Sequence, residues 1–330
     1  MRSLAITMAL AASWVTLTAP RALADPPGPT NYQSEVAKIE PPAADLDIEI
    51  VGGDSFVLLR VPEGTSVVVI GYQGEPYLRY LPDGTVEENA ASPSKYLNEE
   101  RYGGELPEQA DAKAAPQWEV VAGDGSYAWH DHRTHWMNEV PPPGLGPGDQ
   151  VAEGVIPLLW EGVEVDVTVV SVWQDAPSAA PMVVGLILGH GIAIGVFRRR
   201  KTLLLGVSLA LAIAATFVGM VAYLSVPSET APSWTLWMLP ASALLLSLVS
   251  IGLRGETAHR YRTMFLLIAA LQMAVWGLAH WGWLRPAILP TALPYWIDRF
   301  VSSAVLVGAP GAAAAAVALV VAESGEPART

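Results

Sequence analysis

The second half of the chain contains five apolar runs, each long enough to cross a lipid bilayer as a helix. They span residues 181–197, 202–226, 234–253, 263–284 and 300–322. Because an α-helix rises about 1.5 Å per residue, roughly 20 apolar residues cover the hydrocarbon core of a bilayer. We therefore expect residues 179–322 to form an α-helical transmembrane bundle of about five helices, in contact with the lipid bilayer.

The positive residues around these runs predict how the helices are oriented. Arg285 and Arg299 lie at the ends that we expect to face outward. Lysine and arginine are enriched in cytoplasmic loops, so the more positive set of ends is predicted to be cytoplasmic. The C-terminal tail, residues 323–330, then lies in the cytoplasm. The positive residues at the predicted cytoplasmic ends are Arg198, Arg199, Arg200, Lys201, Arg254, Arg260, Arg262 and Arg329.

Residues 1–24 have the pattern of a secretory signal peptide. Arg2 precedes an apolar run, and Ala22-Leu23-Ala24 places small residues where signal peptidase cleaves. An uncleaved first helix is the alternative, but the run is short and is followed by Pro20 and Arg21. We expect cleavage after Ala24 and an extracytoplasmic location for the residues that follow.

The segment between the signal peptide and the helices is strongly acidic and lacks cysteine. From Asp25 to Asp175 it carries 27 acidic and 7 basic side chains, and the whole chain has a net charge of -13. Such a surface repels nucleic acid and attracts cations and basic partners, so we exclude nucleic acid as a partner. Without cysteine there are neither disulfides nor thiolate ligands, so a metal ion would have to be bound by His, Met, Asp or Glu.

This acidic segment has the sequence pattern of short antiparallel strands. Residues 25–45 form a Pro-rich lead that we expect to be extended, and 46–178 contain β-branched runs separated by Gly, Pro and Asp turns. The clearest hairpin joins Val155–Trp160 to Val163–Trp173 through Glu161-Gly162. We predict an all-β sandwich, Ig-like or cupredoxin-like, for 46–178. The stretch from Asn89 to Gln117 lacks periodicity, so we expect it to be a long loop packed on the sandwich.

Three of the six histidines occur within six residues, in the motif Trp129-His130-Asp131-His132-Arg133-Thr134-His135-Trp136-Met137. Alternate residues of a strand share a face, so His130 and His132 could bind one ion, and a turn after Arg133 would add His135. Neutral imidazoles favour copper, with zinc as the alternative. Asp131 is a further possible ligand, and the Met137 thioether favours Cu(I). The motif thus predicts a metal site of His130, Asp131, His132, His135 and Met137.

The same residues are also compatible with a purely structural role. Histidine and aromatic side chains at a strand end often form a hydrogen-bonded corner, and Asp131 with Arg133 would then be an ordinary ion pair. Three functions therefore stay open, namely metal handling, a non-catalytic interaction or scaffold role with another cell-envelope protein, and a metalloenzyme. The interaction hypothesis depends on the acidic surface and on the aromatic segment Tyr72 to Tyr80.

Two histidines lie within the predicted membrane helices, His190 between Gly189 and Gly191 and His280 near one end of the fourth run. Ionisable residues are costly in a membrane and usually face the bundle interior, so both are candidates for an intramembrane polar site. A neutral histidine that bonds a neighbouring helix is the alternative, and we do not expect haem. P-loop, HExxH and GxSxG motifs do not occur, so no catalytic residues are assigned.

Three segments carry a resemblance to known proteins, namely Asn31 to Glu35, Gly71 to Arg79 and Trp129 to Met137. In these segments the chain resembles a family of actinobacterial membrane proteins that carries the extracytoplasmic WHDHRxHWM motif. The resemblance implies a common lineage and no particular activity. The overall layout is also similar to bacterial copper-handling proteins, in which a small β-domain outside the membrane works with a polytopic partner. The copper-resistance β-domain family has an N-terminal histidine that is lacking here.

Overall fold

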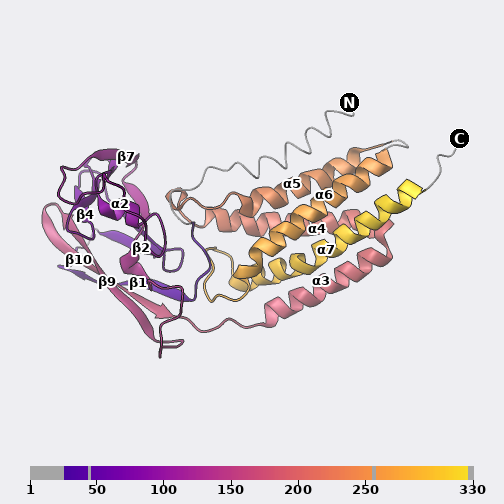
Figure 1. Cartoon of the computed structure of the whole chain (residues 1–330), viewed down its shortest axis with the longest axis horizontal. Coiled ribbons are helices and arrows are strands. Elements are labelled where there is room, and N and C mark those ends of the chain that lie inside the picture. Colours follow the sequence, from indigo (N-terminus) through magenta and orange to yellow (C-terminus); the bar gives the residue numbers. More distant parts are fainter. Residues whose placement is uncertain (1–25, 44–45, 255–257, 326–330) are drawn as a thin grey trace.

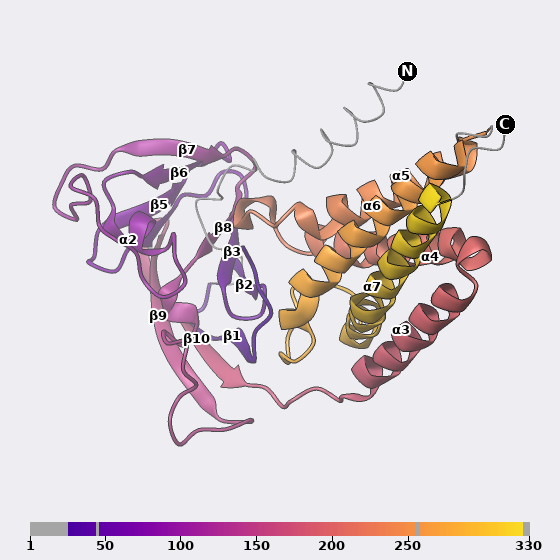
Figure 2. The same ribbon diagram turned by 45° about the vertical axis from the view of Figure 1, so that its right-hand side comes forward.

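The computed structural model describes residues 26–43, 46–254 and 258–325. The predicted signal peptide, residues 1–24, and the end of the predicted cytoplasmic tail lie outside the described residues. A β-sheet region comes first, and a bundle of helices follows it at one end (Figure 1). Figure 2 shows the same arrangement after a rotation, with the connection after β10 running into α3.

The larger sheet is antiparallel and seven-stranded, in the order β1-β10-β9-β4-β5-β6-β7. Its long central hairpin follows the prediction. The turn residues Glu161 and Gly162 have φ values of 50° and 78°, the left-handed conformations that a two-residue hairpin turn favours. The strands are β1 (Tyr32–Glu40), β4 (Val67–Ile70), β5 (Pro76–Tyr80), β6 (Val86–Asn89), β7 (Trp118–Ala122), β9 (Gln150–Trp160) and β10 (Val163–Trp173).

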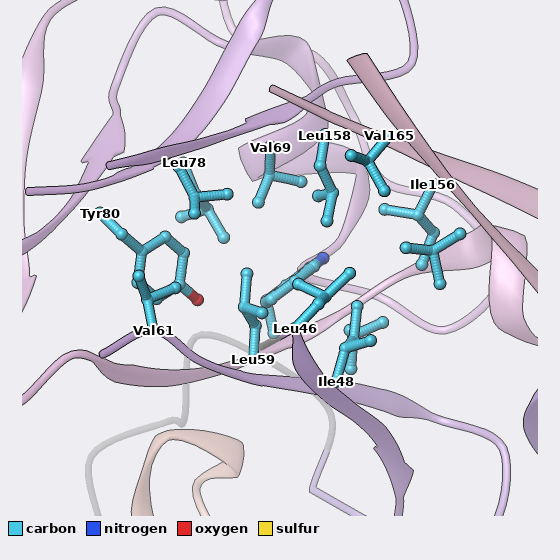
Figure 3. Packing of buried hydrophobic residues seen from close by; sticks show 14 of the residues in the cluster. Leu46, Ile48, Leu59, Val61, Val69, Leu78, Tyr80, Ile156, Leu158 and Val165 are labelled. Carbon is cyan, nitrogen blue, oxygen red and sulfur yellow. The ribbon is translucent and has the colours of Figure 1, made fainter. Parts of the chain in front are cut away.

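The smaller sheet is also antiparallel, with the order β2-β3-β8, where β2 is Asp47–Val51, β3 is Phe56–Arg60 and β8 is Ser126–His130. Apolar side chains of the two sheets meet between them (Figure 3). Leu59 lies opposite Leu78 and Leu158 in this layer, and all three side chains are fully buried. The structure thus confirms two antiparallel sheets with a common core.

The β-region begins earlier than the sequence indicates. Tyr32–Glu40, within the predicted lead 25–45, forms strand β1 and pairs with β10. Its burial does not alternate regularly, and the register shifts between Val36 and Lys38. The strand pairs with β10 through backbone hydrogen bonds, which an irregular hydrophobic pattern does not reveal.

Five helices in the described residues are long and apolar enough to span a membrane, as predicted. The fourth and fifth helices begin about five residues earlier than the predicted runs, because polar residues continue the helix beyond the apolar segment. The fourth also ends earlier, at Ala279, where the 3₁₀ turn His280–Trp283 follows. Their length and composition suit a membrane location. The helices are α3 (Ala180–Arg198), α4 (Arg200–Leu224), α5 (Thr235–Gly252), α6 (Ala258–Ala279) and α7 (Tyr295–Gly325).

Small residues allow α3 and α7 to pack closely. A Cβ atom added at Gly189 would lie 2.7 Å from the Ala304 carbonyl oxygen, and one at Gly311 would lie 2.3 Å from the Ala193 Cβ. Backbones this close leave no room for a larger side chain. Gly311 and Ala304 of α7 therefore serve helix packing.

The two regions contact each other directly. Thr30, just before β1, forms an antiparallel bridge with Ile288, in the connection between the 3₁₀ turn η4 (His280–Trp283) and α7. Two backbone hydrogen bonds of 3.0 and 2.8 Å hold this bridge. The Asn31 side chain accepts a further bond from the Ala287 N–H, at 3.0 Å. The sheets are thereby fixed to the same end of the bundle at which His280 lies.

Candidate functional site

The three clustered histidines lie where strand β8 ends in a tight turn. His130 is the last residue of β8, and the 3₁₀ turn η2 (His132–Thr134) follows. The Asp131 carboxylate caps this turn by accepting a hydrogen bond of 3.0 Å from the Arg133 N–H. The sequence predicts a turn after Arg133, but in the structure the chain turns earlier, at Asp131. This earlier turn brings His135 back beside His130.

The three imidazole rings form one cluster. The ring centroids of His130 and His135 are 5.0 Å apart, and that of His132 lies 5.2 Å from His130 and 5.8 Å from His135. The rings of His130 and His135 are parallel within 5°, yet their Nε2 atoms are only 3.0 Å apart. Since the nitrogens are closer than the centroids, the two rings meet at their Nε2 edges.

Hydrogen bonds on the far side of each ring define the protonation of this pair. His130 Nδ1 lies 3.0 Å from the Asn98 carbonyl oxygen, and His135 Nδ1 lies 3.0 Å from the Trp136 carbonyl oxygen. Because a carbonyl only accepts, each Nδ1 must carry the hydrogen. The two neutral rings then point unprotonated Nε2 atoms at each other, and a third proton or another cation is needed between them.

Burial disfavours a third proton between the two Nε2 atoms. His130 is 5 % exposed and His135 is 2 % exposed. Burial, together with the neighbouring histidines, lowers the pKa of His130 to about 3. Burial and the Arg101 guanidinium lower the pKa of His135 to about 4. At neutral pH the pair is therefore uncharged, with both lone pairs available to a cation.

His132 completes the cluster from a more exposed position. Its Nε2 bonds to the Glu100 carbonyl oxygen at 2.8 Å, which leaves the lone pair on Nδ1. The ring stacks on Tyr72, with centroids 5.8 Å apart, and the Tyr72 hydroxyl accepts a 2.8 Å bond from the His132 N–H. Burial lowers the pKa of His132 as well. To turn toward the other two rings, the His132 ring would have to give up the Glu100 bond and its stacking on Tyr72.

Asp131 has a structural role. Its carboxylate is buried and receives Arg133 Nε and Nη2 at 2.8 and 2.7 Å and Trp129 Nε1 at 3.0 Å. Burial alone would raise the pKa of Asp131, but the Arg133 guanidinium and these hydrogen bonds lower it to about 2. Both oxygens are engaged, so Asp131 anchors the turn and is not available to a metal ion. The Arg133 guanidinium, paired with Asp131, lies over the Tyr72 ring on which His132 stacks.

Met137 is 40 % exposed and lies with His132 and His135 in the wall of a surface cavity of about 380 Å³. In 26–43, 46–254 and 258–325, however, no group of three or more His, Asp or Glu side chains stands arranged to hold a metal ion. The structure thus places the His130 and His135 imidazoles in contact, with the His132 imidazole beside them.

Residues that the sequence did not single out shape the site. Asn98 provides the carbonyl for His130, and Arg101 forms a partly buried ion pair with Asp54, at 2.6 Å. Arg101, Tyr102 and His130 line a second cavity of about 360 Å³ beside the cluster. Asn98 to Tyr102 belong to the long loop predicted for Asn89 to Gln117. The structure forms a short helix, α2 (Pro93–Leu97), within this predicted loop, capped by Ser92 and followed by Asn98. The contacts of Asn98 and Arg101 with the site are distant in sequence, so periodicity does not identify them.

The two membrane histidines occupy different environments. His190 is exposed on α3, and its Nδ1 lies 2.9 Å from the Leu186 carbonyl oxygen of the same helix. His280 is buried in η4, with Nδ1 3.0 Å from the Trp276 carbonyl oxygen. The predicted preference for the bundle interior therefore applies to His280 alone of the two.

Comparisons with known proteins found no matching family model and no significantly similar curated protein or solved structure.

Proposed function

We propose that the β-region binds a transition-metal ion, copper or zinc, between His130 and His135, with His132 as the third ligand. The observation that carries this proposal is the 3.0 Å separation of two Nε2 atoms whose Nδ1 atoms both face carbonyl oxygens. Two neutral imidazoles so placed need a cation between them, and their burial disfavours a proton. A metal ion meets the same need and leaves the rings neutral.

The separation of the two nitrogens is compatible with metal coordination. Zinc and copper lie about 2.0–2.1 Å from a histidine nitrogen, so two ligands at a right angle are about 2.9 Å apart and two tetrahedral ligands about 3.4 Å apart. The Nε2 atoms are 3.0 Å apart. A shift of a few tenths of an ångström would admit the ion. The carbonyl bonds to Nδ1 would fix the ring tautomer, as outer partners of metal ligands usually do.

The donor set favours copper over zinc. In a chain without cysteine, imidazoles are the strongest ligands available, and copper(II) binds nitrogen sites most tightly among divalent first-row ions. Met137 would add a soft sulfur for Cu(I) from the wall of the same cavity. A half-exposed third ligand and an open cavity suit a carrier or sensor better than a closed structural site. We also propose that the two sheets have the Ig-like or cupredoxin-like topology that the sequence predicts.

The His130→Ala/His135→Ala double variant should bind metal at least about 100-fold more weakly than the unaltered chain. Loss of an outer partner alone costs 10–100-fold in affinity, and here two ligands are lost. His132→Ala should cost about tenfold. The measurement is competition with a chromophoric chelator for Cu(II) and Zn(II), using the full chain in detergent. His190→Ala, at an exposed helical position, is the control. Unchanged affinity in the double variant would refute the site.

We also propose that the sheets lie outside the membrane and that the C-terminus is cytoplasmic. The support is the distribution of positive residues between alternate helix ends. A bacterial alkaline phosphatase fused to the C-terminus should be inactive, because this enzyme folds only in an oxidising compartment. The same fusion placed after Asp175 should be active. High phosphatase activity of the C-terminal fusion would contradict the proposed orientation and place the C-terminus outside the cytoplasm.

A further inference from the structure

A cavity of about 290 Å³ lies where α4, α5 and α6 end beside the sheet region. Helices α4 and α5 contribute Ala222 and Leu236, and the Pro26–Gly28 segment that leads into β1 contributes part of the wall. The remaining wall is almost entirely apolar. For comparison, an apolar cavity of about 150 Å³ is large enough to bind benzene. The cavity therefore has room for one substituted ring or a short lipid segment.

One residue of this wall, His280, has a buried polar atom without a partner among the described residues. His280 is 2 % exposed, and its Nδ1 donates to the Trp276 carbonyl oxygen at 3.0 Å. The hydrogen on Nδ1 leaves Nε2 as an acceptor, and Nε2 is buried without a hydrogen-bond partner in the part of the chain that the structure describes. An unpaired buried acceptor is unfavourable, so a ligand that donates a hydrogen bond to it gains affinity.

Three other polar groups of the wall have hydrogen-bond partners. The Trp276 indole N–H donates to the Leu236 carbonyl oxygen at 2.7 Å, and the hydroxyls of Ser233 and Thr235 bond each other, also at 2.7 Å. Two indole rings flank the acceptor. The His280 ring stacks on Trp276 with centroids 3.8 Å apart and lies 5.1 Å from the Trp283 ring. The cavity thus combines an apolar wall, aromatic faces and one acceptor.

We propose that this cavity binds the ring of a lipophilic phenol or quinol, whose hydroxyl donates a hydrogen bond to His280 Nε2. A hydroxyl supplies the donor that the acceptor lacks, and an aromatic ring matches the flanking indoles and the apolar wall. A metal ion would find only one ligand there. A ligand with carbonyl groups alone would leave Nε2 unpaired. This proposal is independent of the histidine cluster in the sheets.

Two probes that differ in one hydrogen-bond donor test the proposal, namely 4-butylphenol and 4-butylanisole. The full chain in lipid nanodiscs, with a chelator present, is titrated with each by isothermal calorimetry. The phenol should bind about 3–10-fold more tightly than the anisole, the ratio expected for one neutral hydrogen bond of about 0.5–1.5 kcal/mol. In His280→Phe this ratio should fall to about one. His190→Phe should keep it, because His190 bonds its own helix on the exposed face of α3.

A second variant, Ala279→Leu, tests the cavity even if His280→Phe does not fold. Ala279 lies in the cavity wall and is itself exposed, so Ala279→Leu should narrow the cavity without disturbing the core. It should weaken both probes. Equal affinity for phenol and anisole, a ratio that survives in His280→Phe, or no binding of the phenol would each overturn the proposal. If the phenol does not bind, the cavity would be filled by water and would have no ligand of this class.

Discussion

Replacing Asp131 by alanine should lower the free energy of unfolding of the sheet region by about 3–5 kcal/mol. Asp131 is fully buried, and its carboxylate pairs with the Arg133 guanidinium at 2.7 Å and accepts the Trp129 indole N–H at 3.0 Å. The substitution leaves the Arg133 charge buried without a counter-ion. It also removes the cap of η2, so the turn that places His135 beside His130 should loosen.

Denaturant titration of the full chain, followed by hydrogen exchange of peptides from the sheets, measures this effect. Asp47→Ala is the matched control, because Asp47 pairs with Arg60 at 3.2 Å on the exposed surface. An exposed pair contributes about 0–1 kcal/mol. A loss in Asp131→Ala no larger than in Asp47→Ala would contradict the anchoring role of Asp131.

Without metal, the sheet region should become less stable as the pH falls below about 6.5. The folded state lowers the pKa of His130 to about 3 and that of His135 to about 4, mainly by burial. In this pH range the unfolded chain therefore binds more protons than the folded chain, and protonation favours unfolding. Each histidine contributes up to about 1.4 kcal/mol per pH unit, between its ordinary pKa and its lowered one. The contribution of Asp131 is lost only at still lower pH, towards its pKa of about 2.

Unfolding free energies of the metal-free chain, measured at several pH values between 7 and 4, check this slope. In His130→Gln/His135→Gln the slope should become clearly shallower, because glutamine does not titrate. His190→Gln should keep the full slope, since His190 is exposed. An equal slope in the double variant and the unaltered chain would mean that the two imidazoles are not buried as neutral groups.

Local patterns in the sequence were enough to predict much of the fold. The hairpin turn at Glu161 and Gly162 and the five apolar helices depend on residues close together in the chain, so periodicity and turn chemistry identify them. Strand β1 was missed because it is held by backbone pairing with β10, about 130 residues away in sequence. Patterns of side chains carry little information about such an edge strand.

The candidate site was predicted only in part. The motif identified the three histidines, but the strand periodicity paired His130 with His132, whereas the Asp131 cap brings His135 to His130. Asn98, whose carbonyl fixes the His130 tautomer, directly follows the short helix Pro93–Leu97, in a stretch predicted to be a loop. The cavity at His280 depends on three helices and could not be inferred from any one of them. Such features arise from tertiary contacts.

X-ray absorption of the full chain loaded with one equivalent of Cu(II) or Zn(II) tests the proposed metal site most directly. We predict a first shell that contains two or three imidazole nitrogens at about 2.0 Å. This imidazole signal should be lost in His130→Ala/His135→Ala and kept in His190→Ala. A shell of oxygen ligands alone, or a spectrum that is unchanged in the double variant, would contradict the account and would place the metal on the acidic surface instead.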